Sequence, residues 1–142
     1  MTIRINADEM RYMALFESLT GARVRDCVID PSGSSITFVV NKGDVGLAIG
    51  RDGAKVKHAR RVMGKGIEVV EYSGDPVEFL KNTLQPAKVK TVDISERDGR
   101  KIAVISVELQ DKGLAVGRGG KKILNAKRLV ERLHGIQDIL IR

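Results

Sequence analysis

The sequence predicts an α+β fold that consists of two similar units, each a small three-stranded sheet covered by helices. The first observation behind this prediction is an internal repeat: residues 46–53 (GLAIGRDG) and 113–120 (GLAVGRGG) are identical at six of eight positions, at an offset of 67 residues. The second is that helix-like and strand-like segments follow one another in the same order in both halves of the chain. With 142 residues, 42% of them hydrophobic, the chain has the size and composition of two small folded units.

The first expected element is a helix that begins after Asn6. The Asn6 side chain can accept a hydrogen bond from the first turn, and Glu9, three positions later, completes the pattern of a capping box. Apolar side chains then recur every three residues, at Met10, Met13, Phe16 and Leu19. Gly21 follows, and a glycine in that position typically ends a helix.

A hairpin of two strands is expected next. Residues 24–29 and 35–40 are rich in β-branched and apolar side chains, which favour strands. Between them, Pro31 has a fixed φ and Gly33 has wide conformational freedom, so this segment suits a turn. The rest of the unit predicts a short helix from Asn41 or Asp44 to Gly50, a longer helix over 53–63 and a strand over 67–72.

The boundary between the units is expected at residues 73–76. Asp75 followed by Pro76 is a typical helix start, because the Asp side chain can accept a bond from the first turn and Pro lacks only an N–H that has no partner there. We therefore expect domains at 1–73 and 74–142. The second domain should repeat the order of the first, with a helix at 77–84, strands at 88–95 and 101–107 joined by a turn at 96–99, a short helix capped by Asp111, a longer helix at 121–133 and a strand at 136–141.

Positive charge is concentrated in two segments. Lys and Arg total 25 against 18 Asp and Glu, which gives the chain a net charge of +7 and a pI near 9.8. Residues 42–66 contain seven bases and two acids, and residues 110–132 contain the same numbers. The rest of the chain is therefore net negative. Positive charge confined in this way favours a polyanionic partner such as nucleic acid.

Each basic segment contains a Gly-x-x-Gly sequence, at residues 50–53 and 117–120, between a short apolar helix and a longer basic one. Glycines permit a sharp reversal between two helices and the close approach of another backbone. The helix that follows offers unpaired N–H groups and the positive end of its dipole, and Arg51 and Arg118 lie at the tips of the loops. A single Gly-x-x-Gly is most often only a turn, but two copies at matched positions indicate a phosphate-binding loop.

The strand, short helix, Gly-x-x-Gly loop and basic helix resemble the KH domain, and the order of all elements resembles its prokaryotic, type II arrangement. The signature positions are residues 49–53 and 116–120. Two closely spaced KH domains resemble the archaeal form of the NusA family, whose members act in transcription elongation, termination or antitermination. The resemblance implies a protein that holds about four nucleotides of single-stranded RNA in a groove. Bacterial members also carry a polymerase-binding domain and an S1 domain that have no counterpart in this sequence, which leaves RNA polymerase as a candidate partner only.

The resemblance also implies which residues contact the RNA backbone, namely those of the two loops and of the first turns after them. The expected RNA-binding residues are Gly50, Arg51, Asp52, Gly53, Lys55, Gly117, Arg118, Gly119, Gly120, Lys121 and Lys122. Apolar residues near each loop are candidates for the groove wall and equally for the core: Leu47, Ile49, Val56, Leu114, Val116 and Ile123. Because the Asp52 carboxylate repels phosphate and offsets Arg51, we expect the second loop to bind more strongly.

No enzyme activity, cofactor, metal ion or small-molecule substrate is expected. Residues 113–122 resemble a nucleotide-binding P-loop only superficially, since Ala115 and Lys122 occupy positions where that motif needs glycine and Ser or Thr. Neither His58 nor His134 has a partner nucleophile, so solvated or capping roles are favoured. Three acidic residues fit a hairpin turn more simply than a metal site: Asp93, Glu96 and Asp98.

Membrane insertion and secretion are not expected. The sequence has no run of about 18 apolar residues, and residues 1–6 have neither the apolar core nor the cleavage site of a secretory signal, so we expect a cytoplasmic protein. The single Cys27 cannot form an internal disulfide and is expected to be buried. Aromatic residues make up only 4% of the chain, which argues against aromatic platforms for bases. Four of them are expected in the core: Tyr12, Phe16, Phe38 and Phe79.

A second class of function stays open on the sequence alone. The two units could form a non-catalytic scaffold that binds RNA polymerase or ribosome components and contacts RNA only weakly. Asp52 in the first loop and the net negative remainder of the chain favour this alternative. Salt-sensitive RNA binding distinguishes the two functions, because each phosphate that a protein neutralises releases counterions.

Overall fold

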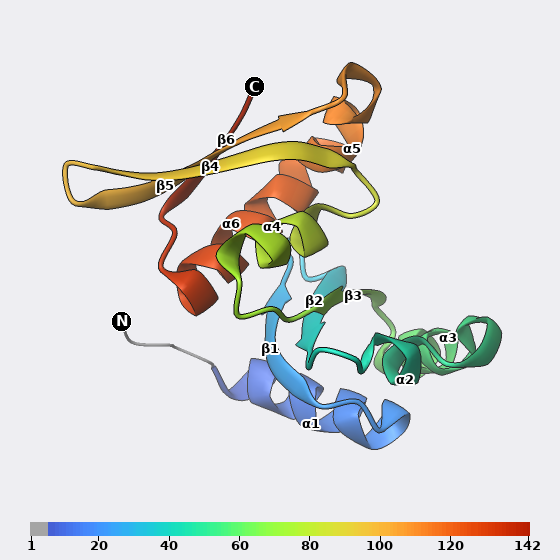
Figure 1. Cartoon of the computed structure of the whole chain (residues 1–142). Coiled ribbons are helices and arrows are strands. Elements are labelled where there is room, and N and C mark those ends of the chain that lie inside the picture. The colour runs from blue at the N-terminus through green and yellow to red at the C-terminus, as the bar shows by residue number, and fades with distance from the viewer. Residues whose placement is uncertain (1–5) are drawn as a thin grey trace. The chain divides into compact units, whose positions relative to one another are not determined.

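The computed structural model describes residues 6–142, which form two compact units, and one unit ends at Ser73 where the other begins at Gly74. Each unit contains helix, strand, strand, helix, helix and strand in that order (Figure 1). The predicted α+β class and the predicted order of elements are therefore confirmed. Residues 1–5, which bear on the secretory signal and belong to the first expected domain, lie outside the described residues.

The first unit begins with the capped helix that the sequence predicts. Its elements are α1 (Ala7–Thr20), β1 (Val24–Ile29), β2 (Ser35–Val40), α2 (Val45–Ile49), a 3-10 turn η1 (Arg51–Gly53), α3 (Ala54–Met63) and β3 (Gly66–Glu71). The Asn6 side chain accepts a hydrogen bond from the Glu9 N–H at 2.8 Å, and the Glu9 carboxylate accepts one from the Asn6 N–H at 3.1 Å. Gly21, with a φ of 82°, closes the other end of α1 in the left-handed conformation.

The sheet of the first unit has β2 in its centre. Strand β1 pairs with β2 in antiparallel register, with Cys27 opposite Phe38, and β3 pairs with the other edge of β2 in parallel register. Helices α1 and α3 cover one face, where Phe16 stacks on Phe38 with ring centroids 4.2 Å apart and Ala59 is fully buried. Such an aromatic pair stabilises a core by about 1 kcal/mol beyond its buried area. Cys27 lies in this core, as predicted.

The second unit repeats this order from Asp75 onward. Its elements are α4 (Pro76–Leu84), β4 (Val89–Arg97), β5 (Arg100–Val107), a 3-10 turn η2 (Leu109–Asp111), α5 (Lys112–Val116), a second 3-10 turn η3 (Arg118–Gly120), α6 (Lys121–His134) and β6 (Asp138–Ile141). The Asp75 carboxylate accepts a hydrogen bond from the Val77 N–H at 3.1 Å, and Pro76 occupies the first turn, which confirms the predicted helix start. Strand β5 is central, antiparallel to β4 and parallel to β6.

The β4–β5 hairpin is longer than the sequence suggested. Its strands stay paired as far as Arg97 opposite Arg100, so the turn consists of Asp98 and Gly99 alone, with φ angles of 53° and 78°. Two positive φ angles match the twist of a hairpin, and Asp and Gly tolerate them better than most residues. The predicted four-residue turn at 96–99 was therefore too wide.

The predicted core aromatics are mostly buried. Phe16, Phe38 and Phe79 are fully buried, and Tyr12 is partly buried against the same core as Phe16. The His134 ring lies against Phe79, with ring centroids 5.2 Å apart, so His134 contributes to packing.

None of the helices within residues 6–142 is both long and apolar enough to cross a bilayer.

Candidate nucleic-acid interface

The first glycine of each loop is required by a close approach. Helices α2 and α5 end at Gly50 and Gly117, where φ is 76° and 79°. A Cβ atom on Gly50 would lie 2.4 Å from Cγ and 2.9 Å from the backbone N of Lys55. A Cβ atom on Gly117 would lie 2.6 Å from Cβ and 2.8 Å from the backbone N of Lys122. Because real side chains do not approach so closely, only glycine lets the second helix start here.

The last two residues of each loop share a left-handed backbone. Asp52 and Gly119 have φ angles of 53° and 63°, and the glycines that follow them have φ angles of 75° and 78°. The N–H of the last glycine donates to the carbonyl of the first at 3.1 Å in both loops. The two loops therefore have the same backbone conformation, although the second variable residue is Asp in one and Gly in the other.

The loop tips present positive side chains and uncapped helix starts. Arg51 and Arg118 are exposed, and so is Lys121 in the first turn of α6. Neither α3 nor α6 has a side-chain cap at its N-terminus or an acidic residue in its first turn. Backbone N–H groups and the positive helix end can therefore take an anion, which is what the sequence predicts for these loops.

The two lysines at matched positions after the loops each donate to a backbone carbonyl. Lys55 Nζ donates to the Thr20 carbonyl at 3.4 Å, and Lys122 Nζ donates to the Gln85 carbonyl at 2.8 Å. The sequence placed both among the RNA contacts. Sequence reasoning missed their backbone partners, which lie 35 and 37 residues away along the chain.

Asp44 and Asp111 have a role that sequence reasoning also missed. Both were candidates for helix caps, yet neither makes a side-chain cap bond to its helix. Instead, each carboxylate accepts a hydrogen bond at 3.0 Å from the backbone N–H of a residue just before the first strand of its unit, Arg23 or Lys88. Their equivalent positions in the repeat were the signal that could have pointed to a shared role.

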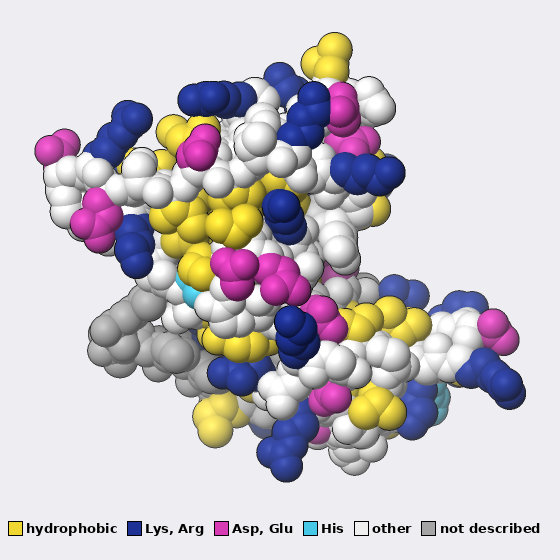
Figure 2. Space-filling view, in the orientation of Figure 1, with side chains coloured by type: hydrophobic (Ala, Val, Ile, Leu, Met, Phe, Trp, Pro, Cys, Tyr) yellow, Lys and Arg dark blue, Asp and Glu magenta, His cyan; other side chains and the backbone are white. Residues whose placement is uncertain are grey.

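The structure separates the apolar candidates into surface and interior. Leu47 and Ile49 on α2 are 50% and 38% exposed, and Leu114 and Val116 on α5 are 47% and 39% exposed. Val56 is buried in the core of its unit. Ile123 is partly buried. Figure 2 shows hydrophobic side chains interspersed with Lys and Arg over the α2–α3 end of the first unit. The short helix before each loop thus presents apolar surface beside the positive tip.

Part of the basic charge serves the fold itself. Arg60 on α3 donates to the Ile67 carbonyl at 3.1 Å, and Lys65 donates to the Gly33 carbonyl. In the second unit, Lys127 on α6 pairs with Asp138 at the start of β6, at 3.2 Å. These contacts attach the longer basic helix, or the residues after it, to the sheet. The positive charge available to a ligand is therefore smaller than the sequence count suggests.

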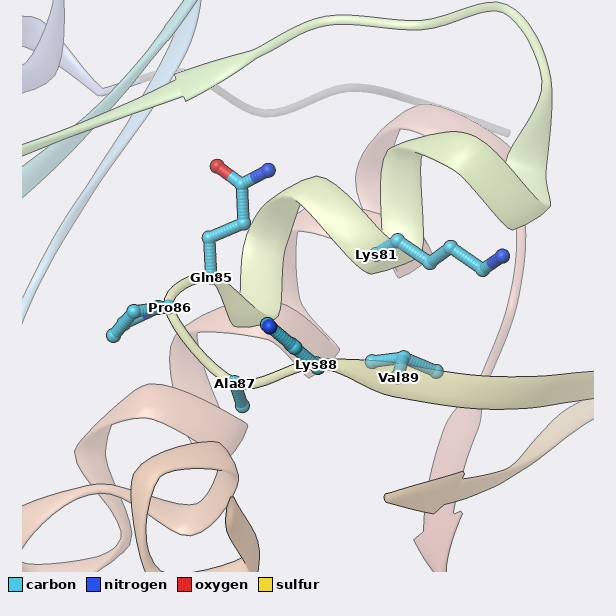
Figure 3. A pocket seen from close by; sticks show the side chains of 6 residues that line it. All are labelled: Lys81, Gln85, Pro86, Ala87, Lys88 and Val89. Carbon is cyan, nitrogen blue, oxygen red and sulfur yellow. The ribbon is translucent and has the colours of Figure 1, made fainter. Parts of the chain in front are cut away.

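The second unit also has a surface hollow at the connection between α4 and β4. Its lining residues are Lys81, Gln85, Pro86, Ala87, Lys88 and Val89 (Figure 3). The ammonium groups of Lys81 and Lys88 point in different directions in this view, so they do not converge on one ligand.

Among residues 6–142, no three His, Cys, Asp or Glu side chains come together as a metal site. Asp93 and Glu96 lie on strand β4, and Asp98 lies in the turn between β4 and β5.

Comparisons with known proteins match both units. Residues 10–74 match the model of the KH domain family, and residues 76–138 match the model of the NusA-like second KH domain. A solved structure titled "Crystal structure of APE1850" is 39% identical in sequence and superposes with a TM-score of 0.84. The match covers 97% of this chain and 100% of the chain in that structure.

Relatives of known name agree with these matches. The "Probable transcription termination protein NusA" of Halococcus morrhuae is 37% identical over 139 residues, which are 98% of this chain and 98% of the relative. The protein of the same name from Methanococcus vannielii is 34% identical over 141 residues, which are 99% of this chain and 80% of the relative. This α+β chain, with its two tandem type II KH domains, belongs to the NusA family.

Proposed function

We propose that this protein binds single-stranded RNA and acts, like other NusA-type factors, in transcription elongation, termination or antitermination. The observation that carries the proposal is the pair of Gly-x-x-Gly loops, which have one backbone conformation, exposed arginines and uncapped helix starts within a NusA-family chain. KH domains use this loop to clamp the backbone of about four nucleotides. The proposed role is binding rather than catalysis, in the cytoplasm, with RNA polymerase as the protein partner.

The proposed site consists of the two loops and the surface beside each of them. One loop lies in each of the two proposed domains, 1–73 and 74–142. Arg51, Arg118 and Lys121 would contact phosphates, and the N–H groups of the two middle residues of each loop, 51–52 and 118–119, would donate to phosphate oxygens. The exposed apolar side chains of α2 and α5 would lie under the bases: Leu47, Ile49, Leu114 and Val116. This surface supports base contact without aromatic platforms.

A non-catalytic scaffold for RNA polymerase or ribosome components is the second candidate. The observation that favours it is the use of basic side chains in contacts within the fold, as at Arg60 and Lys127, together with the carboxylate of Asp52 in the first loop. Both features reduce the charge that RNA would meet. A scaffold of this kind binds RNA weakly even at low salt, where a phosphate clamp binds best.

The test is a titration of a fluorescent single-stranded RNA pool, followed by anisotropy at 50 and 200 mM salt. We expect the intact chain to lose affinity on the order of 50-fold over this range if about four phosphates are neutralised. A variant with Arg51→Asp, Arg118→Asp and Gly119→Asp should bind weakly at both salt concentrations. The control reverses Arg97 and Arg100 at the β4–β5 tip, which lowers the net charge by four, against five in the loop variant, and leaves both loops unchanged.

Two results would count against the clamp. Equal losses from the loop variant and from the control would show that the loops are not the site. Weak, salt-insensitive binding by the intact chain would favour the scaffold, and the next experiment would then be a binding assay with purified RNA polymerase. Circular dichroism of each variant establishes that the fold is intact.

A further inference from the structure

Each loop is attached to the first helix of its unit by the side chain of one lysine. The stems of Lys55 and Lys122 lie directly against the first glycine of their loop, at the positions that exclude a Cβ atom there. Their ammonium groups reach the carbonyls of Thr20 and Gln85, at 3.4 and 2.8 Å. Thr20 is the last residue of α1, and Gln85 is the residue that follows α4. The same connection therefore occurs twice, in two units.

Both acceptors are favourable places for an ammonium group. The carbonyl of Thr20, the last residue of α1, has no partner within the helix and carries part of its negative charge. Gln85 lies beyond α4 with a ψ of 141°, so its carbonyl is a backbone acceptor outside the helix. The segments that supply the carbonyls differ in sequence, Thr-Gly-Ala-Arg at 20–23 and Gln-Pro-Ala-Lys at 85–88. Because the acceptor is backbone in both, the contact does not depend on that difference.

A second bond attaches the same segment from the other side of the loop. The Asp44 carboxylate accepts from the Arg23 N–H, and the Asp111 carboxylate accepts from the Lys88 N–H, both at 3.0 Å. The residue before the short helix and the second residue of the longer helix thus both bind the connection between the first helix and the first strand. The helix pair that carries each loop is held at both ends.

We propose that Lys55 and Lys122 are positioning residues, which hold each Gly-x-x-Gly loop against the first helix of its unit, rather than ligands of RNA phosphates. The expected effects on RNA binding rest on the proposed function, whereas the expected effects on the loop in the free protein do not. An ammonium group bound to a backbone carbonyl orients the loop and adds little to the charge at its tip. Arg51 and Arg118, at the tips, are the groups that neutralise phosphate.

The salt dependence of RNA binding separates these roles. Lys122→Met and Arg118→Met each remove one positive charge and keep an unbranched stem, so they form a matched pair. For Arg118→Met, the slope of the logarithm of the binding constant against the logarithm of salt concentration should fall by about 0.7, the value for one phosphate on a single strand. For Lys122→Met, the slope should stay unchanged while affinity falls about tenfold, as expected from the lower end for one lost hydrogen bond from a charged donor.

Amide hydrogen exchange in the free protein tests the geometry without RNA. We expect exchange at Gly117 and Gly120, whose N–H groups are hydrogen-bonded in the loop, to be faster in Lys122→Met than in the intact chain, and unchanged in Arg118→Met. Lys122→Arg should restore both exchange and affinity, because a guanidinium can donate to the same carbonyl. Lys55→Met gives the same readouts in the first unit, with a smaller effect because its bond is longer, and serves if Lys122→Met does not fold.

Two outcomes would overturn the inference. A fall in salt slope for Lys122→Met equal to that for Arg118→Met would make Lys122 a phosphate ligand. Unchanged loop exchange in Lys122→Met would show that the lysine does not hold the loop. If the intact chain binds no RNA, the proposed function fails, and the exchange measurement alone still decides whether the lysine positions the loop.

Discussion

The two Gly-x-x-Gly loops have the same backbone but different charge. Asp52 and Gly119 occupy equivalent places, with φ angles of 53° and 63°. Without the positioning lysines, residues 50–54 contain one Arg and one Asp, for a net charge of 0, whereas residues 117–121 contain one Arg and one Lys, for a net charge of +2. The first glycine therefore fixes the shape of the loop, while the variable residues set how strongly the loop attracts an anion.

The largest effect should come from the residues that the loops share. Gly50→Ala and Gly117→Ala place a Cβ atom within 3 Å of a lysine backbone N, at a φ near +80°, and we expect each to destabilise its own unit by about 3 kcal/mol. Gly119→Ala is the matched control, because no atom lies within 4 Å of its Cβ position; its cost should be about 1 kcal/mol, from the left-handed backbone alone. Urea denaturation, followed by NMR signals of each unit, measures both.

Equal destabilisation by Gly117→Ala and Gly119→Ala would contradict the inference that the close approach of Gly117 and Lys122 fixes the loop shape. A large difference between Gly50→Ala and Gly117→Ala would instead show that the two units do not depend on this contact to the same extent.

The next effect concerns the bonds that hold the short helices. Asp44→Ala and Asp111→Ala each leave a backbone N–H without its carboxylate acceptor, at the same 3.0 Å distance in the two units. We expect each to destabilise its unit by about 1.5 kcal/mol, the lower end for a hydrogen bond to a charged group. The same NMR-monitored urea denaturation measures them. Asn in either position should recover part of the loss, since its amide oxygen can accept the bond.

The charge difference between the loops should appear in RNA affinity. Asp52→Asn removes the carboxylate, keeps the shape and tolerates the left-handed backbone, and we expect it to tighten RNA binding by the first loop about fivefold, or roughly 1 kcal/mol. Gly119→Asp should weaken the second loop by a similar factor. Each is measured by anisotropy in a chain whose other loop carries Arg51→Asp or Arg118→Asp. If neither substitution changes affinity, the residue after the loop arginine does not face phosphate.

Local patterns were sufficient to predict most of the fold. The capping box at Asn6, the glycine at position 21 and the Asp75–Pro76 helix start each act within a few residues, and the structure has all three. The internal repeat then predicts, for each element of the first unit, an equivalent element in the second. The β4–β5 turn was predicted too wide because the sequence around Asp98 and Gly99 is charged throughout, so nothing in its hydrophobic pattern marks where strand pairing stops.

The candidate site was harder to predict than the fold. Leu47 and Val56 are equally apolar in sequence, and only the packing of the helices decides that one is half exposed and the other buried. Likewise, a lysine after a glycine loop looks the same whether it contacts a phosphate or a carbonyl. The acceptor of Lys122 is a backbone atom 37 residues earlier, and backbone atoms leave no signature in sequence.

The smallest effect concerns how each longer basic helix is attached to its last strand. In the first unit Arg60 donates to the Ile67 carbonyl, which does not titrate, whereas in the second unit Lys127 pairs with the Asp138 carboxylate. Burial alone raises the pKa of Asp138, but the Ile139 N–H and the Lys127 ammonium group more than offset this, so the pKa lies below its ordinary value. A lowered pKa means that the charged Asp138 stabilises the fold above the pKa of the unfolded chain, near 3.9, and that this contribution is lost as pH falls through the folded value.

Because the Lys127 and Asp138 side chains are 39% and 32% exposed, the contribution should be below about 1 kcal/mol. Asp138→Asn keeps an oxygen for the Ile139 N–H and removes the charge, so it isolates this term. We expect the intact chain to be more stable than Asp138→Asn in its second unit at pH 6, and this difference to shrink as pH falls below about 3.9, with no difference in the first unit at any pH. Urea denaturation over a series of pH values, followed by NMR signals of each unit, tests this, and a stability difference that does not shrink as pH falls would assign the effect of Asp138 to packing rather than to its charge.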